Sequence, residues 1–298
     1  MPNSHKTRAT LTGLLTILIW STLAILGVLV GNIPPFQLVA MAFTVVFTLI
    51  VTIWLLRGEK PWTHFKLPAS AWTLGVTGLF GYHLLYFVGI QNAPPADANL
   101  INYLWPVLIV LFSALLPARS EVGALRWFHV TGAGLGFLGT ALIIAGGTGL
   151  SFNSNHTYGY AAAIGAALLW ASYSVLSRRF AHISTNAVGS FCGATALLAW
   201  LAHFAIEPTI WPTDTEAWLA VLAIGLGPVG FAFFFWDHAV KHGDLRVIGA
   251  TAYAAPVLST LLLVMFGFTA PTWTLALACA LVTGGGLLAA RDLIAGRS

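Results

Sequence analysis

The sequence contains very little charge. Only 7% of its 298 residues are Asp, Glu, Lys or Arg, whereas soluble domains carry about a quarter. Hydrophobic residues make up 58% of the chain, and a soluble protein cannot bury that much apolar surface. Lipid must therefore be the solvent of this chain. The composition excludes a soluble domain and leaves no basic patch with interleaved aromatics that would bind nucleic acid.

Cysteine is also scarce, and metal ligands are scattered. Both cysteines, Cys192 and Cys279, fall inside apolar runs, where we expect packing residues rather than a disulfide. Within these runs we find no pair of histidines at i, i+4 spacing, and we predict neither a metal site nor a cofactor. His83 and His203 have no carboxylate near them in the sequence, which argues against a membrane enzyme.

The apolar residues fall into ten runs. A helix needs about 20 apolar residues to cross ~30 Å of hydrocarbon, and each run meets that length. We therefore predict an all-α integral membrane protein with ten transmembrane helices in a single transmembrane domain, residues 1–298. The predicted spans are Thr10–Val30, Phe36–Leu56, Ala69–Asn92, Ala96–Leu116, Leu125–Gly147, Tyr158–Ser177, Ala187–Ile206, Ala217–His238, Val247–Phe268 and Thr272–Ala290.

Every basic residue falls on the same side when the chain is threaded through these spans in alternation. The loops on the opposite side carry only Glu207, Asp214 and Glu216 as charged residues. Because cytoplasmic loops attract Lys and Arg, we predict that both termini are cytoplasmic. The 13 basic residues are Lys6, Arg8, Arg57, Lys60, Lys66, Arg119, Arg126, Arg178, Arg179, Lys241, Arg246, Arg291 and Arg297.

The two halves of the chain correspond to each other at an offset of about 150 residues, which indicates an internal repeat. The predicted repeats, 9–147 and 158–291, have five spans each. An odd number forces the halves to enter the membrane in opposite senses. Inverted repeats are typical of secondary transporters, whose substrate site lies near the midplane between the halves. The corresponding residues are Trp20 and Trp170, Tyr103 and Tyr253, Pro106 and Pro256, and Gly134 and Gly284.

These features resemble the drug/metabolite transporter superfamily, in particular its EamA-like ten-helix type. The resemblance covers essentially the whole chain, and two of its segments are similar to the YddG-type aromatic amino acid exporters. It implies efflux of aromatic and other neutral amino acids across the bacterial inner membrane. It also implies a central cavity among spans 1, 3, 4, 6, 8 and 9, with spans 5 and 10 at the periphery. The residues that carry it are Trp20–Ser21, Trp170, Ala93–Ala98, the paired prolines, and the YddG-like segments Gly81–Tyr86 and Asn99–Pro106.

The fourth span has a polar face. Asn99, Asn102, Tyr103 and Pro106 recur at steps that keep them on one side of a helix. Lipid does not tolerate two amides, so this face should point inward. Pro106 has no N–H and therefore frees the carbonyl of Asn102. We expect the Asn102 side chain, together with its freed carbonyl, to meet the ammonium of an amino acid. Asn99 is a further candidate for the site, and for both asparagines hydrogen bonding between helices is the alternative.

Aromatic residues in other spans complete the predicted site. In the third span Tyr82, His83 and Tyr86 occupy one narrow sector. One interpretation is that these residues belong to a rim of aromatic side chains at the membrane interface. The ionisable His83 argues against this, because such a group would prefer the interior of the helix bundle. Rings there can stack on an aromatic substrate, while hydroxyl and imidazole groups can donate to its carboxylate.

The second half of the chain adds fewer polar groups. Trp20 and Trp170 should both face the central axis, with core packing as the alternative. Tyr173 lies one helical step from Trp170, and Tyr253 is the repeat mate of a tyrosine in the fourth span. No counterpart of the two asparagines exists in the ninth span. This asymmetry suits a substrate with a charged end and a ring.

The remaining features have simpler explanations. Asp97 and Asp237 lie near span ends, where capping or interfacial roles are expected; a proton-coupling role for either residue is the alternative. No Lys or Arg lies deep in a span, which disfavours phosphorylated substrates. Pro106 and Pro256 are predicted hinges. The span-8 aromatics are expected to pack in the core or contact lipid, with phenylalanines around a cavity as the alternative. The glycines of spans 5 and 10 are expected to allow close packing of helices. These residues are Phe231, Phe234, Phe235 and Trp236, and Gly132, Gly134, Gly136, Gly139, Gly284, Gly285 and Gly286.

Several functional alternatives stay open at this point. An exporter of other neutral metabolites or small drugs fits an aromatic-lined cavity equally well. A structural or accessory membrane protein would need no cavity, and a channel would not need paired hinges. The expected partners are a small-molecule substrate and membrane lipid, with no nucleic acid, and the sequence is compatible with a monomer. The coupling mode also stays open, and an uncoupled carrier that moves a metabolite down its gradient is compatible with the sequence.

Overall fold

The computed structural model describes residues 2–114, 125–148, 150, 152–268 and 270–295. All regular elements in these residues are helices, which confirms the predicted all-α class. Arg119 and Arg297, two of the residues used to predict the orientation, lie outside the described residues. The end of the fourth predicted span, at Leu116, lies outside them too.

The membrane-length helices confirm the predicted spans. Nine helical segments in the described part of the chain are long and apolar enough to cross a membrane, and Trp273–Ala289 is a shorter apolar helix of 17 residues. The nine segments are His5–Leu29, Pro35–Leu56, Ala69–Asn92, Pro95–Ser113, Trp127–Ala145, Ser154–Phe180, Ala187–Ile206, Thr215–His242 and Leu245–Met265.

Individual helices make up these spans in chain order. The first half contains α1 (Pro2–Ser21), α2 (Leu23–Leu29), α3 (Pro35–Leu56), α4 (Ala69–Val76), α5 (Tyr82–Asn92), α6 (Pro95–Asn102), α7 (Trp105–Ser113) and α8 (Trp127–Thr148). The second half contains α9 (Thr157–Leu176), α10 (Ala187–Ile206), α11 (Thr215–Leu226), α12 (Ala232–His242), α13 (Leu245–Thr251), α14 (Ala254–Met265), α15 (Trp273–Ala289) and α16 (Arg291–Ile294).

Two spans in each half are interrupted at corresponding places. A π-helical turn, Thr77–Gly81, joins α4 to α5, and another, Gly227–Phe231, joins α11 to α12. The fourth and ninth spans break just before Pro106 and Pro256, because proline cannot donate to the carbonyl four residues earlier. Such irregular turns are frequent at functional sites, so we expect a functional site near these interruptions, at the centre of the bundle.

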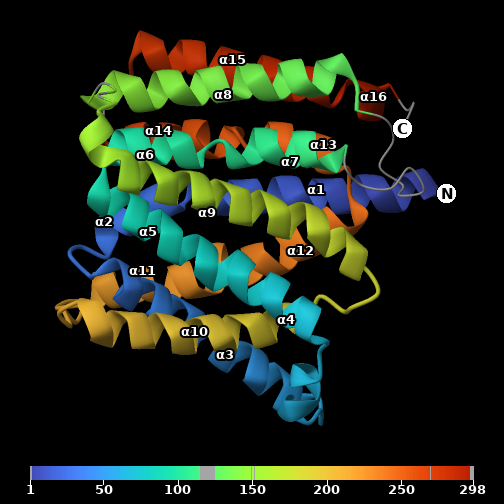
Figure 1. Cartoon of the computed structure of the whole chain (residues 1–298), viewed down its shortest axis with the longest axis vertical. Coiled ribbons are helices and arrows are strands. Elements are labelled where there is room, and N and C mark those ends of the chain that lie inside the picture. Colours follow the sequence, from blue (N-terminus) through green and yellow to red (C-terminus); the bar gives the residue numbers. More distant parts are fainter. Residues whose placement is uncertain (1, 115–124, 149, 151, 269, 296–298) are drawn as a thin grey trace.

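Helices α8 and α15 pack side by side along one edge of the bundle, outside the layer of α6, α7, α13 and α14 (Figure 1). This is the peripheral arrangement expected for spans 5 and 10. We call the contact between these two helices the seam. Their backbones lie directly against each other there, so a Cβ on Gly132 would overlap the carbonyl oxygen of Gly285. Our expectation that Gly134 and Gly284 share this seam is wrong, since a Cβ on either would have nothing within 4 Å.

The seam gives a stability prediction with a matched control. Gly132→Ala should lower the unfolding free energy by about 1–3 kcal/mol, because its methyl group cannot fit without moving α15. Gly134→Ala lies on the same helix in open space and should be neutral or stabilising by up to about 1 kcal/mol. Thermal unfolding in detergent tests both variants. Equal melting temperatures for the two would contradict the packing described here.

Both ends of the described chain lie at one end of the bundle (Figure 1). Lys6 Nζ lies 3.1 Å and Arg246 Nη2 lies 3.0 Å from Asp244 Oδ2 at this end. Burial alone would raise the pKa of Asp244, but the hydrogen bonds and charges of Arg246 and Lys6 outweigh burial and hold this pKa well below 3.8. We call this end the basic end. The opposite end, with Glu207 and Asp214, is the acidic end.

Glu207 connects two spans at the acidic end. Its carboxylate accepts hydrogen bonds from the backbone N–H groups of Phe36, at 3.0 Å, and Gln37, at 3.1 Å. His203 Nδ1 lies 3.0 Å from the same carboxylate. The expectation that His203 has no carboxylate nearby in the sequence is therefore wrong, because Glu207 follows one helical turn later. Since the carboxylate satisfies free N–H groups at the start of α3, its role is structural.

Candidate functional site

A cluster of aromatic rings occupies the centre of the bundle, and we call it the aromatic core. Trp20 and Trp170 meet there with ring centroids 5.7 Å apart, as expected for repeat mates that face the central axis. Trp236 lies 4.9 Å from Trp20, and Tyr82 lies 5.3 Å from Trp170. The members of the aromatic core are Trp20, Tyr82, Trp105, Trp170, Phe233 and Trp236.

Both π-helical turns offer a carbonyl group to a side chain at the core. His83 Nδ1 donates to the Leu79 carbonyl at 2.7 Å, inside the first turn. Trp20 Nε1 donates to the Pro228 carbonyl at 3.0 Å, inside the second. A π-helical turn disturbs the regular i to i−4 pattern, so its carbonyls can accept from elsewhere. The two turns therefore orient an imidazole and an indole ring at the centre of the protein.

Polar side chains from α5 and α6 border the aromatic core, and we call them the polar edge. Asn102 Nδ2 donates to the Tyr82 hydroxyl at 3.3 Å, and the Tyr86 hydroxyl donates to Asn99 Oδ1 at 3.4 Å. The Tyr82 and Tyr86 rings stack at 5.9 Å. Tyr103 comes near both tyrosines. The predicted faces of the third and fourth spans thus meet each other.

The carbonyl oxygen of the Asn102 side chain is the unusual atom of this site. Asn102 is 3% exposed, yet its Oδ1 has no hydrogen-bond partner among the described residues. Leaving a buried acceptor unpaired costs about 1–3 kcal/mol. A protonated amine that entered the site would remove this cost, because an ammonium group donates three hydrogen bonds and accepts none.

Two of the predicted substrate-binding residues, Tyr173 and Tyr253, do not place their hydroxyl groups at the aromatic core or the polar edge. The Tyr173 ring packs on Trp170 at 5.3 Å, but Tyr173 also lines a separate small cavity described below. Tyr253 is fully buried and its hydroxyl accepts from the Val107 backbone N–H at 3.2 Å, at the start of α7. Its ring fills the space beside Gly136. Tyr253 is therefore not brought together with the aromatic core.

Sequence reasoning missed three members of the aromatic core. Trp105 and Phe233 were not assigned to the site, and Trp236 was grouped with residues for packing or lipid contact. Trp236 is fully buried, whereas Phe231 is 48% exposed and points outward as expected. The repeat contained a signal, because Trp236 stands where the first half has Tyr86.

The two acidic residues near span ends are both buried. Asp97 is fully buried and accepts a hydrogen bond from the Tyr160 hydroxyl at 3.0 Å, so it connects α6 to α9. Asp237 is 2% exposed, and its Oδ2 lies 2.8 Å from Lys241 Nζ. Neither the capping nor the interfacial role expected of Asp237 describes this buried ion pair.

The eighth span extends one turn further than predicted. Lys241, which we expected in a loop, lies in the last turn of α12. His238 and His242 lie on the same helix with rings 5.0 Å apart, so the expectation of no i, i+4 histidine pair in a span is wrong. Among the described residues, no three His, Cys, Asp or Glu side chains gather as metal ligands would.

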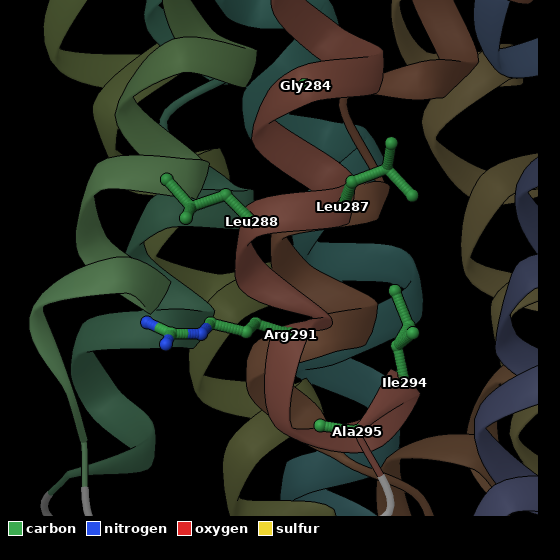
Figure 2. A pocket seen from close by; sticks show the side chains of 6 residues that line it. All are labelled: Gly284, Leu287, Leu288, Arg291, Ile294 and Ala295. Carbon is green, nitrogen blue, oxygen red and sulfur yellow. The ribbon is translucent and has the colours of Figure 1, made fainter.

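An open groove on the protein surface lies away from this site. It is lined by Gly284, Leu287, Leu288, Arg291, Ile294 and Ala295, on one face of α15 and α16 (Figure 2). Apart from Arg291, these residues are apolar. The groove belongs to the peripheral helices and shares none of its lining with the aromatic core or the polar edge.

The fold and the site together define a class of protein. Membrane-length helices in two corresponding halves enclose a buried aromatic core with a polar edge at its centre, beside helices that break at membrane depth. Broken helices around a central site are the architecture of secondary transporters. The chain belongs to the EamA-like transporter family, which matches it twice, over residues 7–145 and 157–291.

Individual relatives match almost the entire chain. The aromatic amino acid exporter YddG of Ancylobacter novellus is 48% identical over 285 residues, which cover 95% of this chain and 97% of that protein. The protein of the same name from Escherichia coli is 26% identical over 291 residues, with coverage of 95% and 97%. A crystal structure at 46% identity superimposes with a TM-score of 0.91 and covers 98% of this chain and 100% of its own.

Proposed function

We propose that this protein is a secondary transporter that exports aromatic and other neutral amino acids across the bacterial inner membrane. The observation that carries this proposal is the unpaired, buried Asn102 Oδ1 beside the aromatic core. Relatives named as aromatic amino acid exporters support both the substrate class and the direction. Transport would proceed by alternating access, without chemical change of the substrate.

The site can hold each part of an aromatic amino acid. The ammonium group would donate to Asn102 Oδ1. The Tyr82 hydroxyl accepts from Asn102 Nδ2, so its own proton remains free to donate to the substrate carboxylate. The substrate ring would rest against Trp20 or Trp170, which offer aromatic edges and faces. One chain supplies all of these groups, so a monomer is sufficient for binding.

Uptake into proteoliposomes tests the function. We expect saturable uptake of labelled phenylalanine and tryptophan, weaker uptake of leucine and none of phosphate, measured with and without a pH gradient. Because no carboxylate lines the aromatic core or the polar edge, uptake should not depend on the pH gradient. Uptake of none of the amino acids would reject the proposal and leave other neutral metabolites as the alternative.

We further propose that residues 1–298 form one transmembrane domain whose five-helix repeats run in opposite senses. The basic end then faces the cytoplasm, together with both termini, as the excess of Lys and Arg there supports. Cysteines introduced at Asn155 and Lys60, which are exposed at opposite ends, test the orientation. An impermeant thiol reagent applied outside intact cells should label the first and not the second.

The breaks before Pro106 and Pro256 are proposed as hinges for the change between inward and outward states. Pro106→Ala would allow the helix to close over the break, because alanine restores the N–H that proline lacks. We expect the maximal transport rate to fall about tenfold while the affinity for phenylalanine stays within about twofold. Transport and binding assays on the same preparation decide this, and an equal loss in both would exclude a hinge role.

A further inference from the structure

The ion pair of Asp237 and Lys241 lies at the wall of a second cavity, separate from the polar edge. Apart from the pair, the cavity is lined mainly by apolar side chains of α4, α10 and the 3-10 turn Ser177–Phe180, among them Leu74, Phe180 and Phe191. Trp170 packs on Tyr173, which also lines the cavity. The cavity therefore sits between the aromatic core and the basic end.

This cavity contains polar groups that packing does not require. Tyr173 is 2% exposed, and its hydroxyl has no partner in hydrogen-bond geometry within the described chain, although the Ser177 side chain lies beside it. Asp237 and Lys241 are 2% and 7% exposed. Burying an ion pair often stabilises a protein no more than apolar residues of the same volume would. Buried charges within a membrane span point to function.

The pair also holds the two sides of the cavity together. The Thr185 hydroxyl donates to Asp237 Oδ2 at 2.8 Å, and Lys241 Nζ donates to the Ile183 carbonyl at 3.0 Å. Both contacts run from α12 to the segment that precedes α10. The cavity holds only about 20 Å³, room for about one water molecule. It is therefore closed in this conformation, and opening it requires these two contacts to separate.

We propose that Asp237 and Lys241 form the site at which a zwitterionic amino acid is first recognised from the basic end. The inference rests on the proposed amino acid transport. When the cavity opens, the two side chains separate from the segment before α10 and from each other. Asp237 then accepts from the substrate ammonium and Lys241 donates to its carboxylate, so the substrate replaces each partner that the opening removes. Leu74, Phe180 and Phe191 would surround its apolar side chain.

Analogues of phenylalanine that carry only one charge can distinguish recognition of the substrate by the ion pair from a role of the pair in closing the cavity. Phenethylamine keeps the ammonium of phenylalanine and lacks the carboxylate, whereas 3-phenylpropionate keeps the carboxylate and lacks the ammonium. In vesicles of known orientation, Asp237→Asn should raise the KM for phenylalanine at the basic end at least tenfold and weaken inhibition by phenethylamine. Inhibition by 3-phenylpropionate should change less than twofold. Lys241→Gln should show the reverse selectivity.

Thr185→Val is the matched control, because it removes a contact across the cavity and leaves both charges in place. It should change inhibition by both analogues by the same factor. If Asp237→Asn and Lys241→Gln also shift phenylalanine and both analogues by one common factor, the pair only closes the cavity and the inference is overturned.

A double variant covers the possibility of misfolding. Asp237→Asn/Lys241→Gln leaves no unpaired buried charge, and it should melt close to the wild type while its KM for phenylalanine at the basic end rises at least tenfold. An unchanged KM in this variant would overturn the inference and leave the transport function intact. If vesicles with the wild-type protein transport no amino acid, the inference is rejected together with the proposed function.

Discussion

Asn102→Leu is expected to reduce phenylalanine transport, as kcat/KM, by about 10- to 150-fold. Asn102 Oδ1 is buried without a partner, so it is free to accept from the substrate ammonium. A hydrogen bond to a charged group contributes about 1.5–3 kcal/mol, and each 1.4 kcal/mol is about tenfold in affinity. Leucine keeps the volume of the side chain but can neither accept from the ammonium nor donate to the Tyr82 hydroxyl. Initial rates in proteoliposomes over a range of phenylalanine concentrations give the ratio.

The control for this variant is an amide outside the site. Asn92 is exposed at the end of α5, where its Nδ2 donates to the Val88 carbonyl. Asn92→Leu should leave transport within about twofold of the wild type, because the lost bond lies on the surface. If Asn102→Leu transports as well as Asn92→Leu, the unpaired carbonyl does not meet the substrate and the proposed site fails.

The fold could be predicted from the sequence because lipid leaves a chain few options. A span must be apolar for about 20 residues and satisfy its own backbone groups, so run lengths identify helices directly. The predicted bounds of a span are wrong where charged residues at its end are paired within the helix. We ended the eighth span at His238, but α12 continues beyond it, and Lys241 in its last turn pairs with Asp237 one turn earlier. This pairing allows α12 to continue to His242.

The site could be predicted only within single helices. Helical spacing brought Asn99, Asn102 and Tyr103 onto one face, and the structure pairs that face with Tyr82 and Tyr86. Contacts between distant helices follow no such rule, because they depend on how the spans pack.

Two residues illustrate this limit. Repeat symmetry suggested equal roles for Tyr103 and Tyr253, yet the latter satisfies an N–H group at the start of α7. Trp236 appeared to be one more apolar residue among several phenylalanines, and it lies within 5.9 Å of Trp170. The π-helical turns that orient His83 and Trp20 also have no signal in the spacing of apolar residues.

The second large effect concerns the aromatic core. Trp170→Leu is expected to lower the preference for phenylalanine over leucine about 2- to 13-fold. Trp170 contacts every other ring of the core, so a substrate ring bound there rests on it or on a ring that it positions. An aromatic pair contributes about 0.5–1.5 kcal/mol beyond the area it buries, and an aliphatic substrate gains none of that. Competition between labelled phenylalanine and leucine in one vesicle preparation measures the preference directly.

Loss of a large buried ring also destabilises the protein, so the control must share that cost. Trp54 is 1% exposed and stacks on His64 at 4.0 Å, away from the aromatic core. Trp54→Leu should lower the melting temperature about as much as Trp170→Leu, since each variant leaves a cavity of similar size. The substrate preference should change only in Trp170→Leu. If both variants shift the preference alike, the aromatic core supports the fold and recognition of the substrate ring lies elsewhere.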